Sequence, residues 1–144
     1  MLVEWNNTAT DYATHKPVHQ FFEEQVALTP GRTAVIFEDA ELSYGELNQR
    51  ANQLAHHLSA MGVKTGGRVG ISIERSLDLM VGLLGILKSG AAYVPLDPSY
   101  PRERLPFMLA DAEVSALLTQ RHLLAQLPEQ AARISAGIGC AELP

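Results

Sequence analysis

Apolar residues along the chain follow two kinds of spacing, and each predicts one kind of element. Where they recur every three to four residues, the spacing is that of one face of a helix. We expect helices at 18–28, 44–61, 77–88, 101–110 and 122–132. Short runs rich in β-branched and aliphatic residues separate these stretches and predict strands. We expect strands at 33–37, 41–44, 68–73, 91–96 and 114–119.

The helix that follows Ser43 has the clearest boundaries. Ser43 and Glu46 stand at the spacing of a capping box, in which the serine hydroxyl accepts from the backbone N–H of Glu46 and the glutamate reaches back. Apolar residues then form one stripe as far as Met61. Gly62 supplies a residue that readily takes the left-handed conformation in which helices end. We therefore expect this helix to bury one face in the core.

The helix at 77–88 has a different character, because it is apolar on nearly all sides. Such a helix is expected to be covered by more than one layer of structure. Ser76 is expected to cap its start and Gly90 to end it. Gly82 and Gly85 lie inside the helix, where we expect them to allow close packing.

Strands and helices alternate from Arg68 onward at the spacing typical of α/β proteins. The sequence therefore predicts an α/β fold with a mostly parallel sheet flanked by helices. Residues 1–16 are mostly polar and are expected to be a linker. Residues 17–133 are expected to form the folded portion, and residues 134–144 a poorly patterned tail, either a strand or a loose end. Pro106 lies inside one of the expected helices and counts against its continuity.

Composition narrows the classes of protein that the chain can represent. Its 144 residues are 47% hydrophobic and 19% charged, which excludes disorder of the chain as a whole. The net charge of −5, without a basic stripe, argues against a nucleic acid or an anionic membrane as the main partner. The longest apolar stretch, 79–87, is too short to cross a bilayer. A single cysteine and a start without a basic and then apolar run fit a cytoplasmic protein.

The glycine-rich segments do not have the order that nucleotide binding requires. Residues 62–68 hold the ingredients of a phosphate loop, but Val63 precedes Lys64 where a glycine is needed. We therefore interpret this segment as a helix-to-strand connection. Gly137 and Gly139 lack the third glycine and the following helix of a dinucleotide-binding loop.

Metal ligands and nucleophiles are not grouped in the sequence either. His15 and His19 are four residues apart, but Pro17 separates them, and no set reaches the three or four ligands of a zinc site. We expect these two histidines, and the other three, to be surface or packing residues; the others are the adjacent His56 and His57 and the isolated His122. Cys140 has no base near it in sequence and is expected to be an inert thiol. The carboxylates expected on solvated helix faces or caps are Glu23, Glu24, Asp78, Glu103, Asp111 and Glu113. Spacing alone thus assigns no catalytic, cofactor-binding or metal-binding residue.

Two segments carry a resemblance to a known family. Residues 42–48, Leu-Ser-Tyr-Gly-Glu-Leu-Asn, resemble the first core motif of nonribosomal peptide synthetase adenylation domains. Residues 87–97, Leu-Lys-Ser-Gly-Ala-Ala-Tyr-Val-Pro-Leu-Asp, look like the second motif, and the likeness continues to Leu105. Residues 5–8 are similar to the stretch that joins a preceding condensation domain to such a domain. The resemblance covers roughly residues 5–120.

The resemblance implies an enzyme of the adenylate-forming, AMP-dependent synthetase and ligase superfamily. Such enzymes convert an amino acid and MgATP into an aminoacyl-adenylate and pyrophosphate, and pass the aminoacyl group to a phosphopantetheine thiol on a carrier domain. This chain would be an incomplete portion of the large N-terminal subdomain. The family's phosphate-binding loop, ribose-binding aspartate and catalytic lysine would lie beyond Pro144. We therefore expect the chain alone to bind no cofactor and to be inactive.

The resemblance also implies partners and leaves alternatives open. The expected partners are the remainder of the adenylation domain and the carrier and condensation domains of the same synthetase, with an MbtH-like auxiliary protein left open. The alternatives are an adenylate-forming ligase of acyl or aryl acids and a non-catalytic α/β interaction module. By itself, the chain is expected to expose apolar faces of the helix at 77–87 and a strand edge, and so to self-associate.

Overall fold

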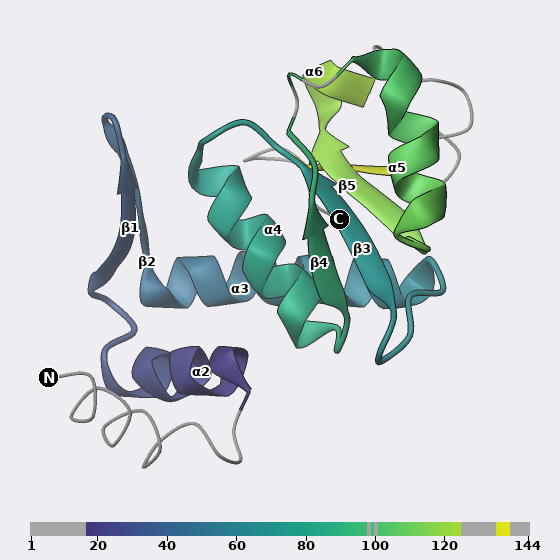
Figure 1. The fold of residues 1–144 in the computed structure, drawn as a ribbon. Coiled ribbons are helices and arrows are strands. Elements are labelled where there is room, and N and C mark those ends of the chain that lie inside the picture. The colour runs from purple at the N-terminus through teal and green to yellow at the C-terminus, as the bar shows by residue number, and fades with distance from the viewer. Residues whose placement is uncertain (1–16, 98, 100, 125–134, 139–144) are drawn as a thin grey trace, which may run out of the picture.

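The chain forms a four-stranded parallel sheet with helices on both faces and a separate two-stranded hairpin, in a computed structural model that describes residues 17–97, 99, 101–124 and 135–138 (Figure 1). The strands are β1 (Thr33–Phe37), β2 (Ala40–Ser43), β3 (Arg68–Ser72), β4 (Ala92–Pro95), β5 (Ala116–Gln120) and β6 (Ser135–Ile138). The helices are α2 (Val18–Leu28), α3 (Tyr44–Ala60), α4 (Leu77–Lys88), α5 (Leu105–Asp111) and α6 (Arg121–Leu124), with a 3-10 turn, η1, at Arg102–Arg104. The predicted α/β fold with a parallel sheet flanked by helices is confirmed.

The sheet has the strand order β4-β3-β5-β6, and each neighbouring pair is parallel. Gly70 in β3 stands opposite Val94 of β4 on one side and Leu117 of β5 on the other, so β3 and β5 form the centre of the sheet. The hairpin pairs β1 and β2 antiparallel, with Phe37 opposite Ala40. Figure 1 shows this hairpin and α2 at one side of the sheet.

The capping box that the sequence predicts at the start of α3 is present. The backbone N–H of Glu46 donates to the Ser43 hydroxyl at 3.2 Å, and the Glu46 carboxylate accepts from the backbone N–H and the hydroxyl of Ser43. Ser43 is also the last residue of β2, and Tyr44, expected in that strand, is the first residue of the helix. Leu47, Ala51, Leu54 and Leu58 are buried, so α3 packs one face on the core as expected, although Met61, at the end of the predicted stripe, is 39% exposed.

The helices α3, α4 and α5 end in the same way before the strands β3, β4 and β5. In each, the residue after the cap has a positive φ and two backbone N–H groups return to the last turn, which is a Schellman motif. Gly62 (φ 101°) and Gly90 (φ 85°) take this place in α3 and α4, as the sequence predicts. Glu113 (φ 54°) takes it in α5, although a residue with a side chain adopts this conformation at a cost. The returning bonds run from Gly62 and Val63 to Ser59 and Leu58, from Gly90 and Ala91 to Leu87 and Ile86, and from Glu113 and Val114 to Ala110 and Leu109.

Two buried hydrophobic clusters lie on the two faces of the sheet. The larger one joins alternate residues of β3 and β5, such as Ile71 and Leu118, to the apolar faces of α3 and α4. The smaller one includes Leu105 and Leu109 of α5 together with Leu117 of β5. Because successive residues of a strand point to opposite faces, Leu117 and Leu118 belong to different clusters. Both faces are therefore covered, as is usual for a parallel sheet.

Two glycines allow α4 to approach its neighbours closely. A Cβ on Gly85 would lie 2.5 Å from Cδ2 of Leu54 in α3, and one on Gly82 would lie 2.9 Å from Cδ1 of Ile71 in β3. The packing role predicted for both glycines is confirmed, as is the covering of α4 by more than one layer. The expected exposure of an apolar face on this helix is wrong for most of its length, because only Met80 among its large apolar residues reaches 36% exposure. The buried residues of α4 are Leu77, Asp78, Val81, Gly82, Leu84, Gly85 and Ile86.

Two expectations about helix starts are wrong for local reasons. Ser76 precedes α4, but its hydroxyl donates to the carbonyl of Glu74 at 2.9 Å and makes no cap with the helix. The helix expected at 101–110 does not begin at residue 101, so Pro106 does not lie in the middle of it. The 3-10 turn comes first, and Pro106 falls in the first turn of α5, where a missing N–H removes no helical hydrogen bond.

The remaining differences concern boundaries toward the end of the chain. β5 begins at Ala116 rather than at Val114, because Val114 completes the end of α5. Of the helix expected at 122–132, the structure describes a short α6 that starts at Arg121, and residues 125–132 lie outside the described residues. Between the strand and the loose end left open for 134–144, residues 135–138 form the strand β6. The expected linker at 1–16 lies outside the described residues.

Candidate functional site

The first candidate site lies at the centre of the sheet. β3 is followed by α4 and by β4 on one side, whereas β5 is followed by α6 and by β6 on the other side. The neighbouring strands β3 and β5 are parallel, so their carboxyl ends lie at the same edge. The strand order reverses between them, and open α/β sheets bind ligands at such points.

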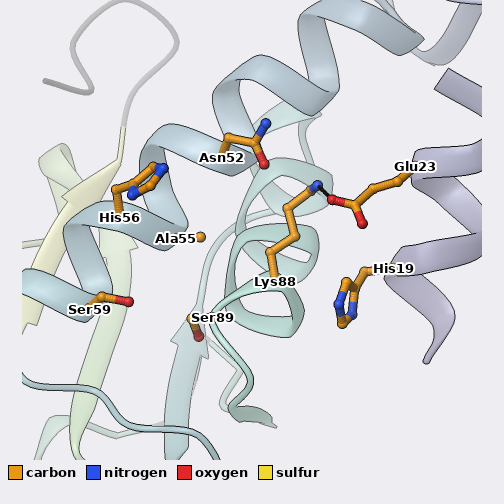
Figure 2. A pocket seen from close by; sticks show the side chains of 8 residues that line it. All are labelled: His19, Glu23, Asn52, Ala55, His56, Ser59, Lys88 and Ser89. Carbon is orange, nitrogen blue, oxygen red and sulfur yellow. Dashed lines mark hydrogen bonds and ion pairs between the residues drawn. The ribbon is translucent and has the colours of Figure 1, made fainter. Parts of the chain in front are cut away.

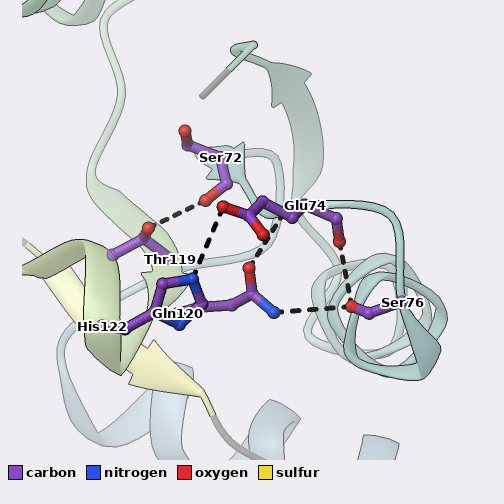
Figure 3. A network of polar contacts seen from close by, with 6 residues as sticks. All are labelled: Ser72, Glu74, Ser76, Thr119, Gln120 and His122. Carbon is purple, nitrogen blue, oxygen red and sulfur yellow. Dashed lines mark hydrogen bonds and ion pairs between the residues drawn. The ribbon is translucent and has the colours of Figure 1, made fainter. Parts of the chain in front are cut away.

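Polar side chains connect the two loops at this edge (Figure 3). The Gln120 side chain, on a residue only 7% exposed, accepts at Oε1 from the backbone N–H of Glu74 at 3.0 Å. Its Nε2 lies 3.5 Å from the hydroxyl of Ser76. Thr119, 1% exposed, donates its hydroxyl to the carbonyl of Ser72 at 2.8 Å. These bonds fix the loop after β3 to the end of β5.

His122 and Glu74 form the outer part of this network. His122 Nε2 lies 3.5 Å from Glu74 Oε1, with the two side chains 59% and 57% exposed. His122 is thus an exposed residue, as expected of a surface histidine, with Glu74 as its partner. A pair so open to water contributes little to stability, and it lacks the water-excluded surroundings in which charged groups act strongly on a substrate. The arrangement is suited to holding two loops together rather than to chemistry.

The second candidate site is a pocket between three helices, which we call the three-helix pocket (Figure 2). Its volume is about 390 Å³, and it lies between α2 and α3 with the last turn of α4 beneath it. Its lining is mostly polar and consists of His19, Glu23, Asn52, Ala55, His56, Ser59, Lys88 and Ser89. Sequence patterns do not indicate this pocket, because its walls come from three segments that are far apart along the chain.

Lys88 supplies an ammonium group to the three-helix pocket. Its side chain is only 4% exposed, and Nζ lies 2.5 Å from Oε2 of Glu23 on α2. The same ammonium lies 5.9 Å from the centroid of the Phe22 ring, within the range of a cation–π contact. The Phe22 ring in turn lies 5.9 Å from that of Tyr44 on α3. These contacts attach α2, which has no fully buried residue, to α3 and α4.

Asp97, the last residue of the second motif, accepts two hydrogen bonds from one residue. The backbone N–H of Ser99 donates to its Oδ1 at 2.9 Å, and the Ser99 hydroxyl donates to the same atom at 2.8 Å. The backbone bond first, and then the hydroxyl, lower the pKa of this exposed carboxyl below its ordinary value. A carboxylate that bonds the backbone two residues on is an Asx turn, so Asp97 directs the chain after β4.

The other candidates raised by the sequence occupy separate places. Residues 62–68 connect α3 to β3, which confirms the interpretation of that segment as a helix-to-strand connection. His19 and His56 come together at the three-helix pocket. Asp78 is 8% exposed and lies in the first turn of α4, so of the two expected places, a solvated face or a helix cap, the solvated face is excluded. His15, Gly139 and Cys140 lie outside the described residues.

Two kinds of feature are missing from the described ranges. In them, no three side chains of histidine, cysteine, aspartate or glutamate are grouped closely enough to hold a metal ion. The helices that the structure describes include none with the length and hydrophobicity needed to cross a membrane. That the chain holds no catalytic or cofactor-binding residue stays a prediction.

Comparison with known proteins gives a family match over most of the chain. A family model described as "AMP-binding enzyme" matches residues 22–141, which extends the likeness beyond Gln120. The chain is 52% identical over 134 residues to a linear gramicidin synthase of Brevibacillus parabrevis, covering 93% of this chain and 3% of that protein. It is 50% identical over 127 residues to gramicidin S synthase 2 of Brevibacillus brevis, covering 88% of this chain and 3% of that protein. The chain therefore spans only a few per cent of the length of these relatives.

Solved structures show the same fold. The nonribosomal peptide synthetase FmoA3 in its α-methyl-L-serine-AMP bound form matches with a TM-score of 0.78 and 31% identity, over 86% of this chain and 15% of that chain. The N-terminal subdomain of Klebsiella oxytoca NpsA in complex with 3-hydroxyanthranilyl-AMSN matches with a TM-score of 0.74 and 29% identity. That match covers 85% of this chain and 31% of that chain, so the described fold corresponds to under a third of the neighbour's N-terminal subdomain.

Proposed function

This chain belongs to the AMP-binding enzyme family, and on that premise we propose that it forms the first part of the N-terminal subdomain of an amino-acid-activating adenylation domain. The complete domain would join an amino acid to ATP, releasing pyrophosphate and forming an aminoacyl-adenylate. It would then pass the aminoacyl group to a phosphopantetheine thiol on a carrier domain, as a step of nonribosomal peptide synthesis.

The observation that carries this proposal is the identity to peptide synthases. The chain is 52% identical to the linear gramicidin synthase over 93% of its length. Its identity to the NpsA subdomain, solved with an aryl compound, is 29%. FmoA3, solved with an α-methyl-L-serine adenylate, is 31% identical, so the solved neighbours do not separate the two substrate classes, and the assignment of an amino acid rests on the identity to the gramicidin synthases.

The described residues do not fit MgATP. A magnesium ion bound to ATP needs only one or two protein carboxylates, because the phosphates and water supply its other ligands, so the fit depends on a cradle for the phosphates. The glycine-rich connection at 62–68 offers none, because Val63, a buried residue, stands where a phosphate loop has a glycine before its lysine. ATP and magnesium are therefore assigned, within the proposal, to parts of the domain other than these residues.

In this chain the two motifs fix the positions of helices, a strand and a turn. The first motif provides the capping box of Ser43 and Glu46 and the buried Leu47, which orient α3. The second motif ends α4 at Gly90, forms β4, and closes with the Asp97 turn. The sheet and helices built in this way would support the catalytic parts of the domain.

The proposal includes partners and a place in the cell. The carrier and condensation domains of the same synthetase would exchange intermediates with the complete domain, and residues 1–16 would be the linker to the condensation domain. An MbtH-like protein stays open as an auxiliary partner. ATP and reduced carrier thiols are available in the cytoplasm, where we place the reaction.

Amino-acid-dependent exchange between ATP and labelled pyrophosphate tests this proposal. Two proteins are compared: the 144-residue chain and the same chain continued by the sequence that follows Pro144 in its genome. We expect exchange with one or a few amino acids from the longer protein and none from the shorter one. Strong exchange by the 144-residue chain would contradict the assignment of ATP binding to other residues.

The same assay separates the alternatives. Exchange by the longer protein with benzoate-type or fatty acids, and with no amino acid, would favour an acyl or aryl ligase. If no acid supports exchange, and the 144-residue chain is a compact monomer that unfolds cooperatively, a non-catalytic interaction module becomes the better account.

A further inference from the structure

The three-helix pocket has no role in the proposed amino-acid activation, and its lining is mostly polar. Its volume of about 390 Å³ falls within the range of small-ligand pockets. Figure 2 shows Lys88 and Glu23 meeting at one end, with His19 on the α2 side and His56 and Ser59 on the α3 side. We propose that this pocket binds an anionic oxygen group, a carboxylate or a phosphate.

The lining of the three-helix pocket holds several groups that can donate hydrogen bonds. The lining offers an ammonium from Lys88, imidazoles from His19 and His56, an amide from Asn52 and the hydroxyl of Ser59. Against these stands one carboxylate, that of Glu23. The imidazoles, the amide and the hydroxyl can also accept hydrogen bonds, but the ammonium can only donate, so the lining can surround a ligand oxygen with donors.

Burial makes any hydrogen bond that the Lys88 ammonium lacks costly. The Lys88 side chain is 4% exposed, and a buried charge is costly unless its hydrogen bonds are made. An ammonium has three N–H bonds, and Oε2 of Glu23 accepts one of them. Two remain for acceptors other than this oxygen. A ligand oxygen in the pocket would satisfy them.

The carbonyl groups at the end of α4 have donors of their own. The Ser89 hydroxyl donates to the carbonyl of Ile86 at 2.6 Å, and the Ser89 backbone N–H donates to those of Gly85 and Ile86. The backbone N–H of Gly90 donates to the carbonyl of Leu87. These carbonyls therefore do not need the Lys88 ammonium, which stays available to the pocket.

Glu23 competes with a bound anion for the Lys88 ammonium, which gives a prediction for its substitution. Its carboxylate is 46% exposed and already occupies one donor of Lys88, so it competes with an incoming anion. Replacing it by glutamine removes a negative charge from the pocket and keeps a similar shape. Glu23→Gln should therefore tighten anion binding, whereas a purely structural ion pair would give looser binding or no change.

The test is an NMR titration of the histidine side chains of the 144-residue chain at pH 6.0 and constant ionic strength. Sodium phosphate and sodium acetate are added in separate arms, with sodium chloride as the control. We expect saturable shifts of His19 and His56, while His122, which lies at the carboxyl edge of the sheet, does not move. Saturation by phosphate identifies a phosphate site and saturation by acetate a carboxylate site. If neither anion gives a saturable shift, the proposal is wrong.

Variants complete the test. Lys88→Met should weaken binding at least about tenfold, because a hydrogen bond to a charged group contributes about 1.5–3 kcal/mol. Lys88→Arg keeps the charge and should retain binding, which separates a lost charge from a lost helix contact. Glu23→Gln should bind several-fold more tightly than the parent chain. Unchanged binding by Lys88→Met, or weaker binding by Glu23→Gln, would overturn the proposal. Because these readouts involve no amino-acid activation, their failure leaves the proposed function untouched.

Discussion

Leu54 of α3 lies so close to Gly85 of α4 that a Cβ on the glycine would come within 2.5 Å of Leu54 Cδ2 and 2.9 Å of its Cβ. Leu54 is 0% exposed, so its side chain has no room to move away. The two helices therefore touch at a point where only glycine fits, and the spacing between them depends on a single missing methyl group.

This contact predicts that Gly85→Ala destabilises the chain. Overpacking a core costs about 1–3 kcal/mol, and alanine recovers up to ~1 kcal/mol of helix propensity, so we expect a smaller but clear net loss of unfolding free energy. Urea denaturation followed by circular dichroism measures it. In a Leu54→Ala background the same substitution should cost less, because the contacts at 2.5 and 2.8 Å are removed and only the contact with Cβ at 2.9 Å remains. Equal losses in both backgrounds would show that the contact does not limit the helix spacing.

The left-handed Glu113 predicts a stabilising substitution. A residue with a Cβ in this conformation costs about 1–2 kcal/mol, part of which glycine gives back through its greater freedom when unfolded. We expect Glu113→Gly to raise the unfolding free energy by about 1 kcal/mol. The matched control is Gly62→Ala, at φ 101° with no other atom within 4 Å of the new Cβ, which should lower it by a similar amount. A lower stability of Glu113→Gly would mean that the glutamate side chain stabilises this turn.

The Asp97 turn predicts a pH effect with a definite sign. Its pKa is lowered in the folded chain, so the turn is stabilised above the pKa of the unfolded carboxyl, about 3.9, and loses that contribution as the pH falls through the folded value. Ser99→Ala removes the hydroxyl but keeps the backbone N–H, so the pKa should rise only part of the way. Carbon-detected NMR titration measures both values. Ser99→Thr is the control that keeps a hydroxyl and should keep the low pKa.

Exposed apolar side chains predict self-association at places other than α4. Phe107 on α5 is 79% exposed and Ile36 on β1 is 67% exposed, and large exposed apolar groups favour association. We expect the mass measured by light scattering to rise with concentration. Phe107→Ser and Ile36→Thr should each reduce that rise. A monomeric mass at all concentrations would contradict the expectation.

Local signals in the sequence predicted much of the fold. Ser43 and Glu46 bond to each other across three residues, and Gly62 and Gly90 act through their own backbone conformation, so neighbours in sequence suffice to predict them. Ser76 shows the limit of this reasoning. A serine before a helix usually caps it, but here its hydroxyl donates to the carbonyl of Glu74, and the Gln120 amide, from a distant strand, lies beside the same hydroxyl.

Sequence patterns could not predict the three-helix pocket, because its contacts also join residues that are far apart along the chain. Lys88 and Glu23 form an ion pair although they are far apart in sequence. His19 and His56 line the same pocket only because α2 packs beside α3. Each residue alone looks like an ordinary surface residue of a helix. The signal that exists is indirect: a lysine at the end of the nearly all-apolar helix α4 has few polar partners available except on a neighbouring helix.

The helices α3, α4 and α5 end in the same way, and each ending leads into the start of a strand. The loops at the start and at the end of the strands therefore differ in how freely their sequences can vary. At the edge where strands begin, each turn is specified by backbone geometry and tolerates few residues at its left-handed position. At the opposite edge the loops are joined by side chains, and a different set of polar residues could join them equally well. Variation among related proteins should therefore gather at the edge where β3 and β5 end, while the other edge keeps the length of every turn.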